Sequence, residues 1–235
     1  MSYKFKCYFT FRDNVTRLNS ALESALPQLL EFSTEEKPIC IINDTNAPIE
    51  SLITIPLDKV ELLHPPVPIL LPETLNWIFK MTYDNQEPWA MWLHTDAVLL
   101  PGAMADIIRK YEQVKDKAWG LIYERNQAFA LFNTKVIHDE QLFYDAWLFP
   151  MYYMDNHFHR ILAIRGYPKF LTDIPDLVKH DKSHTLREDP GLSRRNSLAF
   201  DLHGTLYRRI HGGSPGQEKE LDRTLHGLFP FTGKK

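Results

Sequence analysis

A short apolar run, Ile39-Cys40-Ile41-Ile42, most limits the folds open to this chain. Before it, leucines recur at helical spacing over residues 15–32, and β-forming residues alternate over residues 3–11. A strand without a polar side must be covered on both faces, and a strand, helix, strand order supplies such covering helices. The chain is therefore predicted to fold as an α/β protein with a mostly parallel sheet flanked by helices.

The same alternation continues through the middle of the chain. Residues 72–80 and 101–114 are predicted helices, the second with a proline in its first turn, and residues 89–93 are a predicted buried strand. Residues 119–123 and 128–133 are two β-type runs separated by a turn, which predicts an antiparallel hairpin. The order of elements is typical of a nucleotide-binding sheet.

A last helix is predicted to begin at Asp155 and to stop at Gly166. We expect one catalytic domain over residues 1–185. Residues 186–235, which include the loop-like stretch 193–196, are expected to form a C-terminal extension and a possible lid over the nucleotide site.

Composition narrows the functional class. The 235 residues are 44% hydrophobic and carry a formal net charge of −3, so a full core is expected and no cationic field favours nucleic acid. Only Cys7 and Cys40 are present, both in apolar runs, and disulfides are not expected. No apolar stretch reaches membrane-spanning length and no signal peptide is recognised, so a cytoplasmic location without a strong membrane signal is expected.

Polar residues follow three of the predicted strands. They are Thr10 to Arg12, Asn43-Asp44, and His94-Thr95-Asp96. Ligands of such sheets bind beyond the carboxyl ends of the strands, and His94 and Asp96, two residues apart, face the same side. A carboxylate there needs a partner, either a divalent metal or, in a purely structural role, a turn or a buried arginine.

Two later residues extend this pattern. Asp155 is either the N-cap of its helix or a reactive carboxylate. His180, at the end of a short apolar run, is either a surface histidine or a metal ligand.

In this order the motifs resemble those of GT-A-fold glycosyltransferases of the family 2 type, over about residues 3–185. The stretches that carry the likeness are the strand end at Arg12, IINDT, ETLNW, LHTDA, YMDNHFHRILAIRGY and VKHDKSHT. Two positions depart from the family pattern. His94 stands where the family usually has the first acid of its metal motif, and Met154 stands before Asp155 where two acids are common.

The resemblance implies a transferase that moves a sugar from a UDP-, GDP- or dTDP-sugar to an acceptor hydroxyl on a glycan, a protein or a modified base. Asp155 would be the general base of an inverting reaction, and Asp96 with His180 would hold Mn²⁺ or Mg²⁺. The implied substrate-binding residues are Thr10, Arg12, Asp44, Asn76, His94, Trp119, Arg160, Lys179 and Arg194.

A glycine-rich stretch, RRIHGGSPGQE, spans residues 208–218 and resembles a tail motif of some viral and fungal glycosyltransferases. It is either a phosphate- or sugar-binding loop or an ordinary surface turn. Three other functions stay open: a noncatalytic nucleotide- or sugar-binding module, a nucleotidyltransferase, and a metal hydrolase. The first strand lacks the glycine-rich phosphate loop typical of nucleotidyltransferases, and a hydrolase normally gathers more metal ligands.

Overall fold

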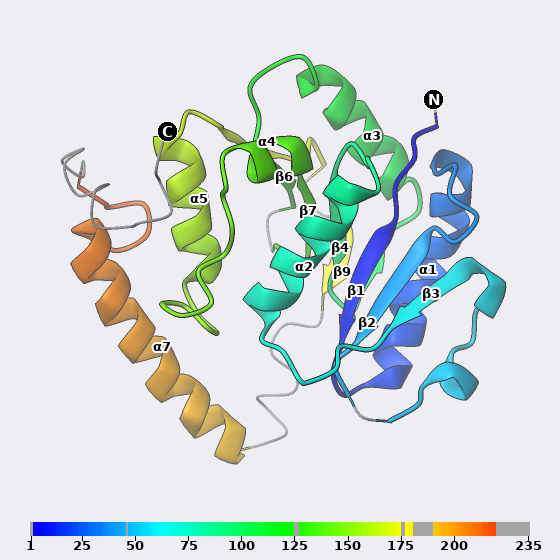
Figure 1. The fold of residues 1–235 in the computed structure, drawn as a ribbon, viewed down its shortest axis with the longest axis horizontal. Helices are drawn as coiled ribbons and strands as arrows, with labels where there is room; N and C mark the ends of the chain where they lie inside the picture. Colours follow the sequence, from blue (N-terminus) through cyan, green and yellow to red (C-terminus); the bar gives the residue numbers. More distant parts are fainter. Residues whose placement is uncertain (1, 46, 125–126, 175–176, 181–189, 220–235) are drawn as a thin grey trace.

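The computed structural model describes residues 2–45, 47–124, 127–174, 177–180 and 190–219. Within them lies a seven-stranded sheet of order β3-β2-β1-β4-β7-β6-β8 (Figure 1). Its strands are β1 Cys7–Phe11, β2 Ile39–Asn43, β3 Val60–Leu63, β4 Ala90–Leu93, β6 Leu121–Tyr123, β7 Phe129–Phe132 and β8 Lys169–Leu171. A second sheet consists of β5 Ala97–Leu99 and β9 Val178–His180.

Helices cover both faces of the large sheet. They are α1 Val15–Phe32, α2 Leu71–Asp84, α3 Ala103–Val114, α4 Thr134–Asp139, α5 Met154–Ile164 and α7 Pro190–His211, with short 3-10 turns η1 Glu50–Leu52 and η2 Leu57–Lys59. Side chains of α1 and α3 pack on one face, and those of α2, α4, α5 and α7 pack on the other. No helix in the described part of the chain combines the length and apolar character needed to cross a bilayer.

Strand direction decides which residues meet at each edge of the sheet. Strands β3, β2, β1 and β4 run parallel, and only β7 runs opposite to its neighbours among the seven described strands. The carboxyl ends of β1, β2, β4, β6 and β8 therefore share one edge with the start of β7. The starts of these strands and the end of β7 lie at the opposite edge.

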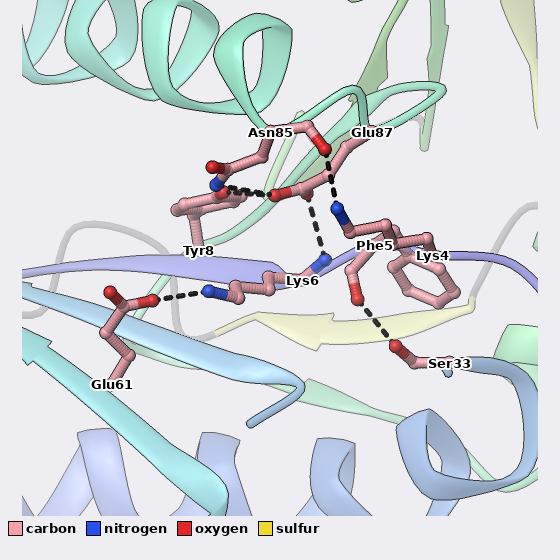
Figure 2. A network of polar contacts seen from close by, with 8 residues as sticks. All are labelled: Lys4, Phe5, Lys6, Tyr8, Ser33, Glu61, Asn85 and Glu87. Carbon is pink, nitrogen blue, oxygen red and sulfur yellow. Dashed lines mark hydrogen bonds and ion pairs between the residues drawn. The ribbon is translucent and has the colours of Figure 1, made fainter. Parts of the chain in front are cut away.

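A buried polar network fixes that other edge. Glu87, only 5% exposed, accepts hydrogen bonds from the Lys6 main-chain nitrogen at 3.1 Å and from the Tyr8 hydroxyl at 2.9 Å (Figure 2). Lys6 Nζ in turn pairs with Glu61 Oε2 at 2.5 Å, which links the residue before β1 to β3 (Figure 2). Burial raises the pKa of Glu87, and these hydrogen bonds partly offset the shift.

Much of the predicted order of elements is confirmed. Asn14 caps α1 by accepting from the Arg17 main-chain nitrogen at 3.1 Å, and the predicted hairpin is the antiparallel pair β6 and β7. Cys7 and Cys40 are buried and free on opposite faces of the sheet.

Other predictions were wrong in their boundaries or type. Residues 60–63, to which the sequence assigns no element, form strand β3. Helix α3 begins only after Gly102, whose φ of 82° excludes Pro101 from the helix. Helix α5 is capped by Tyr153 in a left-handed conformation, so Asp155 is not its N-cap. Residues 193–196 belong to α7 rather than to a loop. The expected boundary between residues 185 and 186, and the stretch DKSHT, lie outside the described residues.

Candidate metal and catalytic site

Three potential metal ligands meet at the carboxyl edge of the sheet. His94 follows β4 directly, and its main-chain nitrogen donates to the Ala128 carbonyl at 2.9 Å. The chain then turns, with the Ala97 nitrogen bonded to the His94 carbonyl at 3.1 Å, and enters β5. Antiparallel pairing of β5 with β9 places His180 opposite Ala97 and so beside Asp96. Tertiary pairing thus brings the distant histidine to the turn.

The geometry of this triad suits a divalent cation. Asp96 Oδ1 lies 3.1 Å from His180 Nε2 and 3.5 Å from His94 Nδ1. One ligand atom from each of the three residues lies within 4.8 Å of the others. Asp96 Oδ1 is buried and has no hydrogen-bond partner of good geometry among the described residues. The buried carboxylate oxygen faces two imidazoles, so the three side chains together offer ligand atoms to a cation.

Electrostatics keep this carboxylate ionised. Burial raises the pKa of Asp96, but contacts with His180 and then His94 outweigh it, and the net shift is downward. The three side chains keep between 13% and 35% of their surface exposed, so solvent or a substrate oxygen has access to the same point. Two imidazoles and one carboxylate form a ligand set of the kind that divalent metal ions bind in proteins.

Asp155 lies in the first turn of α5, and its environment disfavours ionisation. Burial raises the pKa of Asp155, while a hydrogen bond from Tyr144 and the charge of His94 lower it by a smaller amount. The Tyr144 hydroxyl donates to Asp155 Oδ1 at 3.2 Å. The influence of His94 connects Asp155 electrostatically with the triad. A raised pKa of this kind is typical of a carboxyl group that takes part in proton transfer.

Arg12 and Asp44 join the ends of β1 and β2. Arg12 pairs with Asp44 Oδ2 at 2.7 Å and also donates to the Ile69 carbonyl, and Asp44 Oδ1 accepts from the Ile69 nitrogen at 2.8 Å. The Asp44 side chain is only 5% exposed, whereas that of Arg12 is 54% exposed. Thr10, half-buried, precedes them on β1. This edge therefore offers an accessible guanidinium held by a buried carboxylate.

The structure does not bring Trp119 to this site. Trp119 is 3% exposed and packs against Tyr111 just before β6, at the opposite edge of the sheet. There it borders a cavity of about 690 Å³ together with Tyr83 and Glu87. Antiparallel pairing with β7 places the start of β6 at the same end of the sheet as the start of β4, so the structure does not group Trp119 with the other predicted site residues.

Asn76, a predicted substrate-binding residue, bonds to the main chain of Tyr144. Its amide nitrogen donates to the Tyr144 carbonyl at 2.9 Å, and its amide oxygen accepts from the Tyr144 nitrogen at 2.8 Å. Both ends of the side chain are occupied, so the amide holds Tyr144 beside Asp155.

Three predicted basic contacts point elsewhere in the described structure. Lys179 alternates with His180 on β9 and projects to the other side, where it is exposed. Arg160 donates to the Lys219 carbonyl at 3.3 Å, and Arg194 is exposed on α7. None of these three contacts the metal triad.

The glycine-rich stretch forms a tight turn against α5. A Cβ on Gly213 would lie 2.1 Å from the Gln217 carbonyl, so only glycine fits there. His211 Nε2 lies 2.9 Å from His157 Nδ1, and the Tyr207 hydroxyl donates to Glu218 Oε1 at 2.5 Å. These contacts give the stretch a structural role in the described chain.

Two buried polar residues near the candidate site, Tyr144 and Glu124, are not among the residues that the sequence predicted. Tyr144 gave no signal, because its partner depends on tertiary packing. Glu124, fully buried after β6, accepts from the Ala128 nitrogen at 2.8 Å with one oxygen and leaves the other without a partner among the described residues. An acid directly after an apolar strand is the signal that identified Asp96, and it applies equally to Glu124.

Solved structures share this fold. The chain superposes on mannosyltransferase PcManGT from Pyrobaculum calidifontis, solved with GDP-Man and Mn²⁺, with a TM-score of 0.64 and 11% identity over 92% of this chain and 67% of that one. TarS 1-349 of S. aureus matches with a TM-score of 0.55 and 10% identity over 74% of this chain and 58% of TarS 1-349. A second TarS structure has a TM-score of 0.52 and 9% identity, with 73% of this chain covering 35% of that one.

No protein-family model and no curated protein sequence matches the chain. The similarity is therefore one of fold. It confirms the expected GT-A-like α/β architecture with a mostly parallel sheet flanked by helices.

Proposed function

We propose that this protein is a glycosyltransferase that moves a sugar from a nucleoside diphosphate sugar to an acceptor hydroxyl. The convergence of His94, Asp96 and His180 at the carboxyl edge of the sheet carries the proposal. Its support is the position of Asp155 within electrostatic reach of His94, in a fold shared with a mannosyltransferase solved with GDP-Man and Mn²⁺.

The triad would hold Mn²⁺ through the two imidazoles and Asp96 Oδ1. When bound, the ion supplies positive charge against the diphosphate leaving group. Arg12, exposed just after β1, would contact the nucleotide. Its ion pair with Asp44 orients the guanidinium group. Thr10 lies on the same strand end.

Asp155 would act as general base. The acceptor hydroxyl transfers its proton to the Asp155 carboxylate while its oxygen attacks the anomeric carbon of the donor sugar. The bond from that carbon to the diphosphate oxygen breaks, and the nucleoside diphosphate leaves with the electron pair. A single displacement inverts the anomeric configuration.

Release of nucleoside diphosphate tests this function. UDP-, GDP- and dTDP-sugars are incubated with the protein, Mn²⁺ or Mg²⁺, and a panel of glycan, peptide and modified-nucleoside acceptors. We expect one donor to yield nucleoside diphosphate and an inverted product, faster with Mn²⁺. Asp155→Asn is expected to lose at least about a hundredfold in rate, in the range for removal of a general base. Asp173→Asn, which changes a surface carboxylate paired with Lys110, is the matched control.

The alternatives give different products. Pyrophosphate release from a nucleoside triphosphate would identify a nucleotidyltransferase. Binding of a nucleotide sugar without turnover, unaffected by Asp155→Asn, would identify a noncatalytic module. Either result overturns the proposed function.

A further inference from the structure

Helix α7 has one face on the protein and one face in solvent. On its inner face Tyr207 is fully buried, with ring contacts to Phe149 and Tyr153, and His211 is buried beside His157. Figure 1 shows the helix extending along one side of the molecule, next to α5. Its other side is left without covering elements from the described chain.

An apolar pair lies on the outer face. Leu198 is 71% exposed and Leu202 is 66% exposed. Because they are four residues apart, the two side chains are neighbours on one side of the helix. Phe200 differs, since its ring contacts Tyr153 on the inner side at 5.2 Å. The leucine pair therefore forms a small apolar stripe in solvent.

Positive charge surrounds this stripe. The exposed charged residues of α7 are Arg194, Arg195, Arg208, Arg209 and Asp201. By helical spacing, Arg194, Arg195 and Arg209 lie on the same face as the leucines, and Asp201 lies at the border of that face beside Leu198. The whole chain carries a formal net charge of −3, so α7 concentrates a charge opposite to that of the chain.

We propose that the outer face of α7 docks onto an anionic lipid surface. Leu198 and Leu202 would enter the boundary between headgroups and acyl chains, and the arginines would contact the acidic headgroups. A nucleic acid would complement the arginines but would leave both leucines in water. Charge complementarity together with the apolar stripe therefore favours lipid.

The inner side of α7 is fixed to the neighbouring segment. The Tyr152 main-chain nitrogen donates to His203 Nδ1 of α7 at 3.1 Å. This contact leaves the outer face with the leucines free to meet a surface. The inference concerns the surface of α7 and does not require the proposed transferase activity.

Vesicle sedimentation with the full chain tests the proposal. We expect binding to phosphatidylglycerol vesicles, weakening with salt, and at least about tenfold weaker binding to phosphatidylcholine vesicles. Leu198→Ser/Leu202→Ser should reduce binding by about tenfold or more. Arg195→Ala/Arg209→Ala should reduce it by about fivefold for each arginine. Circular dichroism and the thermal midpoint establish that the variants are folded.

A matched pair of exposed leucines serves as control. Leu52 and Leu57, exposed by 51% and 49%, lie in η1 and η2. Leu52→Ser/Leu57→Ser should bind phosphatidylglycerol vesicles as the wild type does. Absence of vesicle binding, equal binding to both lipids, unchanged binding by the α7 variants, or preference for single-stranded nucleic acid over vesicles would each overturn the proposal.

Discussion

Tyr144 donates a hydrogen bond of 3.2 Å from its hydroxyl to Asp155 Oδ1, while Asn76 holds the Tyr144 main chain through two hydrogen bonds. The tyrosine is only 4% exposed, so packing holds its hydroxyl in place as a donor to the carboxylate. A fixed donor stabilises the ionised form that a general base requires before it accepts a proton.

Tyr144→Phe is expected to move the acidic limb of the pH profile of kcat/KM to higher pH. In the wild type, the hydrogen bond from Tyr144 lowers the pKa of Asp155. The variant lacks this bond, so the pKa of Asp155 rises further and the carboxyl group ionises only at higher pH. The variant should lose about 1 kcal/mol of stability from the hydrogen bond. Tyr83→Phe, on a ring stacked on His138, should leave the profile unchanged. An unshifted limb in Tyr144→Phe would exclude this role.

Asp155→Asn is expected to raise the thermal midpoint at neutral and alkaline pH. Burial raises the pKa of Asp155 above its unfolded value, so its favourable contribution is complete below the unfolded pKa and is lost as pH rises through the folded pKa. Asparagine removes that ionisation. The gain over the wild type should therefore shrink toward pH 4 in thermal scans across pH. A gain that grows toward acid pH contradicts this account.

Mn²⁺ is expected to stabilise the protein through the triad. An ion that binds only the folded state raises the free energy of unfolding by about 2.7 kcal/mol when its free concentration is one hundred times its Kd. Asp96→Ala or His180→Ala should abolish the Mn²⁺-dependent thermal shift, since each removes one of the three ligands. His138→Ala, which changes a histidine stacked on Tyr83, should retain it. Retention of the shift in Asp96→Ala would place the ion elsewhere.

The folded protein is expected to lose stability in acid because His157 and His211 are buried side by side. Burial lowers the pKa of each histidine to about 4. The unfolded chain takes up protons near pH 6.5, so stability is complete above that value and falls as the pH decreases toward 4. The maximal slope is about 1.4 kcal/mol per pH unit for each histidine. Urea unfolding across this range measures it.

Replacement of the pair tests the origin of that slope. His157→Gln/His211→Gln should lower stability at pH 7 and also flatten its dependence on pH. His64→Gln, at an exposed histidine near Glu50, should keep the wild-type slope. A double variant with the full slope would assign the acid sensitivity to other groups.

Local sequence patterns predicted most of the helices and strands because their causes are local. The leucine spacing of α1 and its cap at Asn14 depend only on neighbouring residues. Strand β3 and helix α7 were missed for the opposite reason. Strand β3 is defined by its pairing with β2, and α7 lacks a strong apolar face of its own but is anchored through Tyr207.

The sequence by itself determined the α/β order of elements and the placing of Asp96 directly beyond a buried strand, because periodicity and turn chemistry act over a few residues. Only the tertiary structure decided that His180 joins Asp96, through the pairing of β5 with β9, and that Trp119 lies at the opposite edge. Strand register and packing join residues far apart in the chain, and no local pattern encodes those distances.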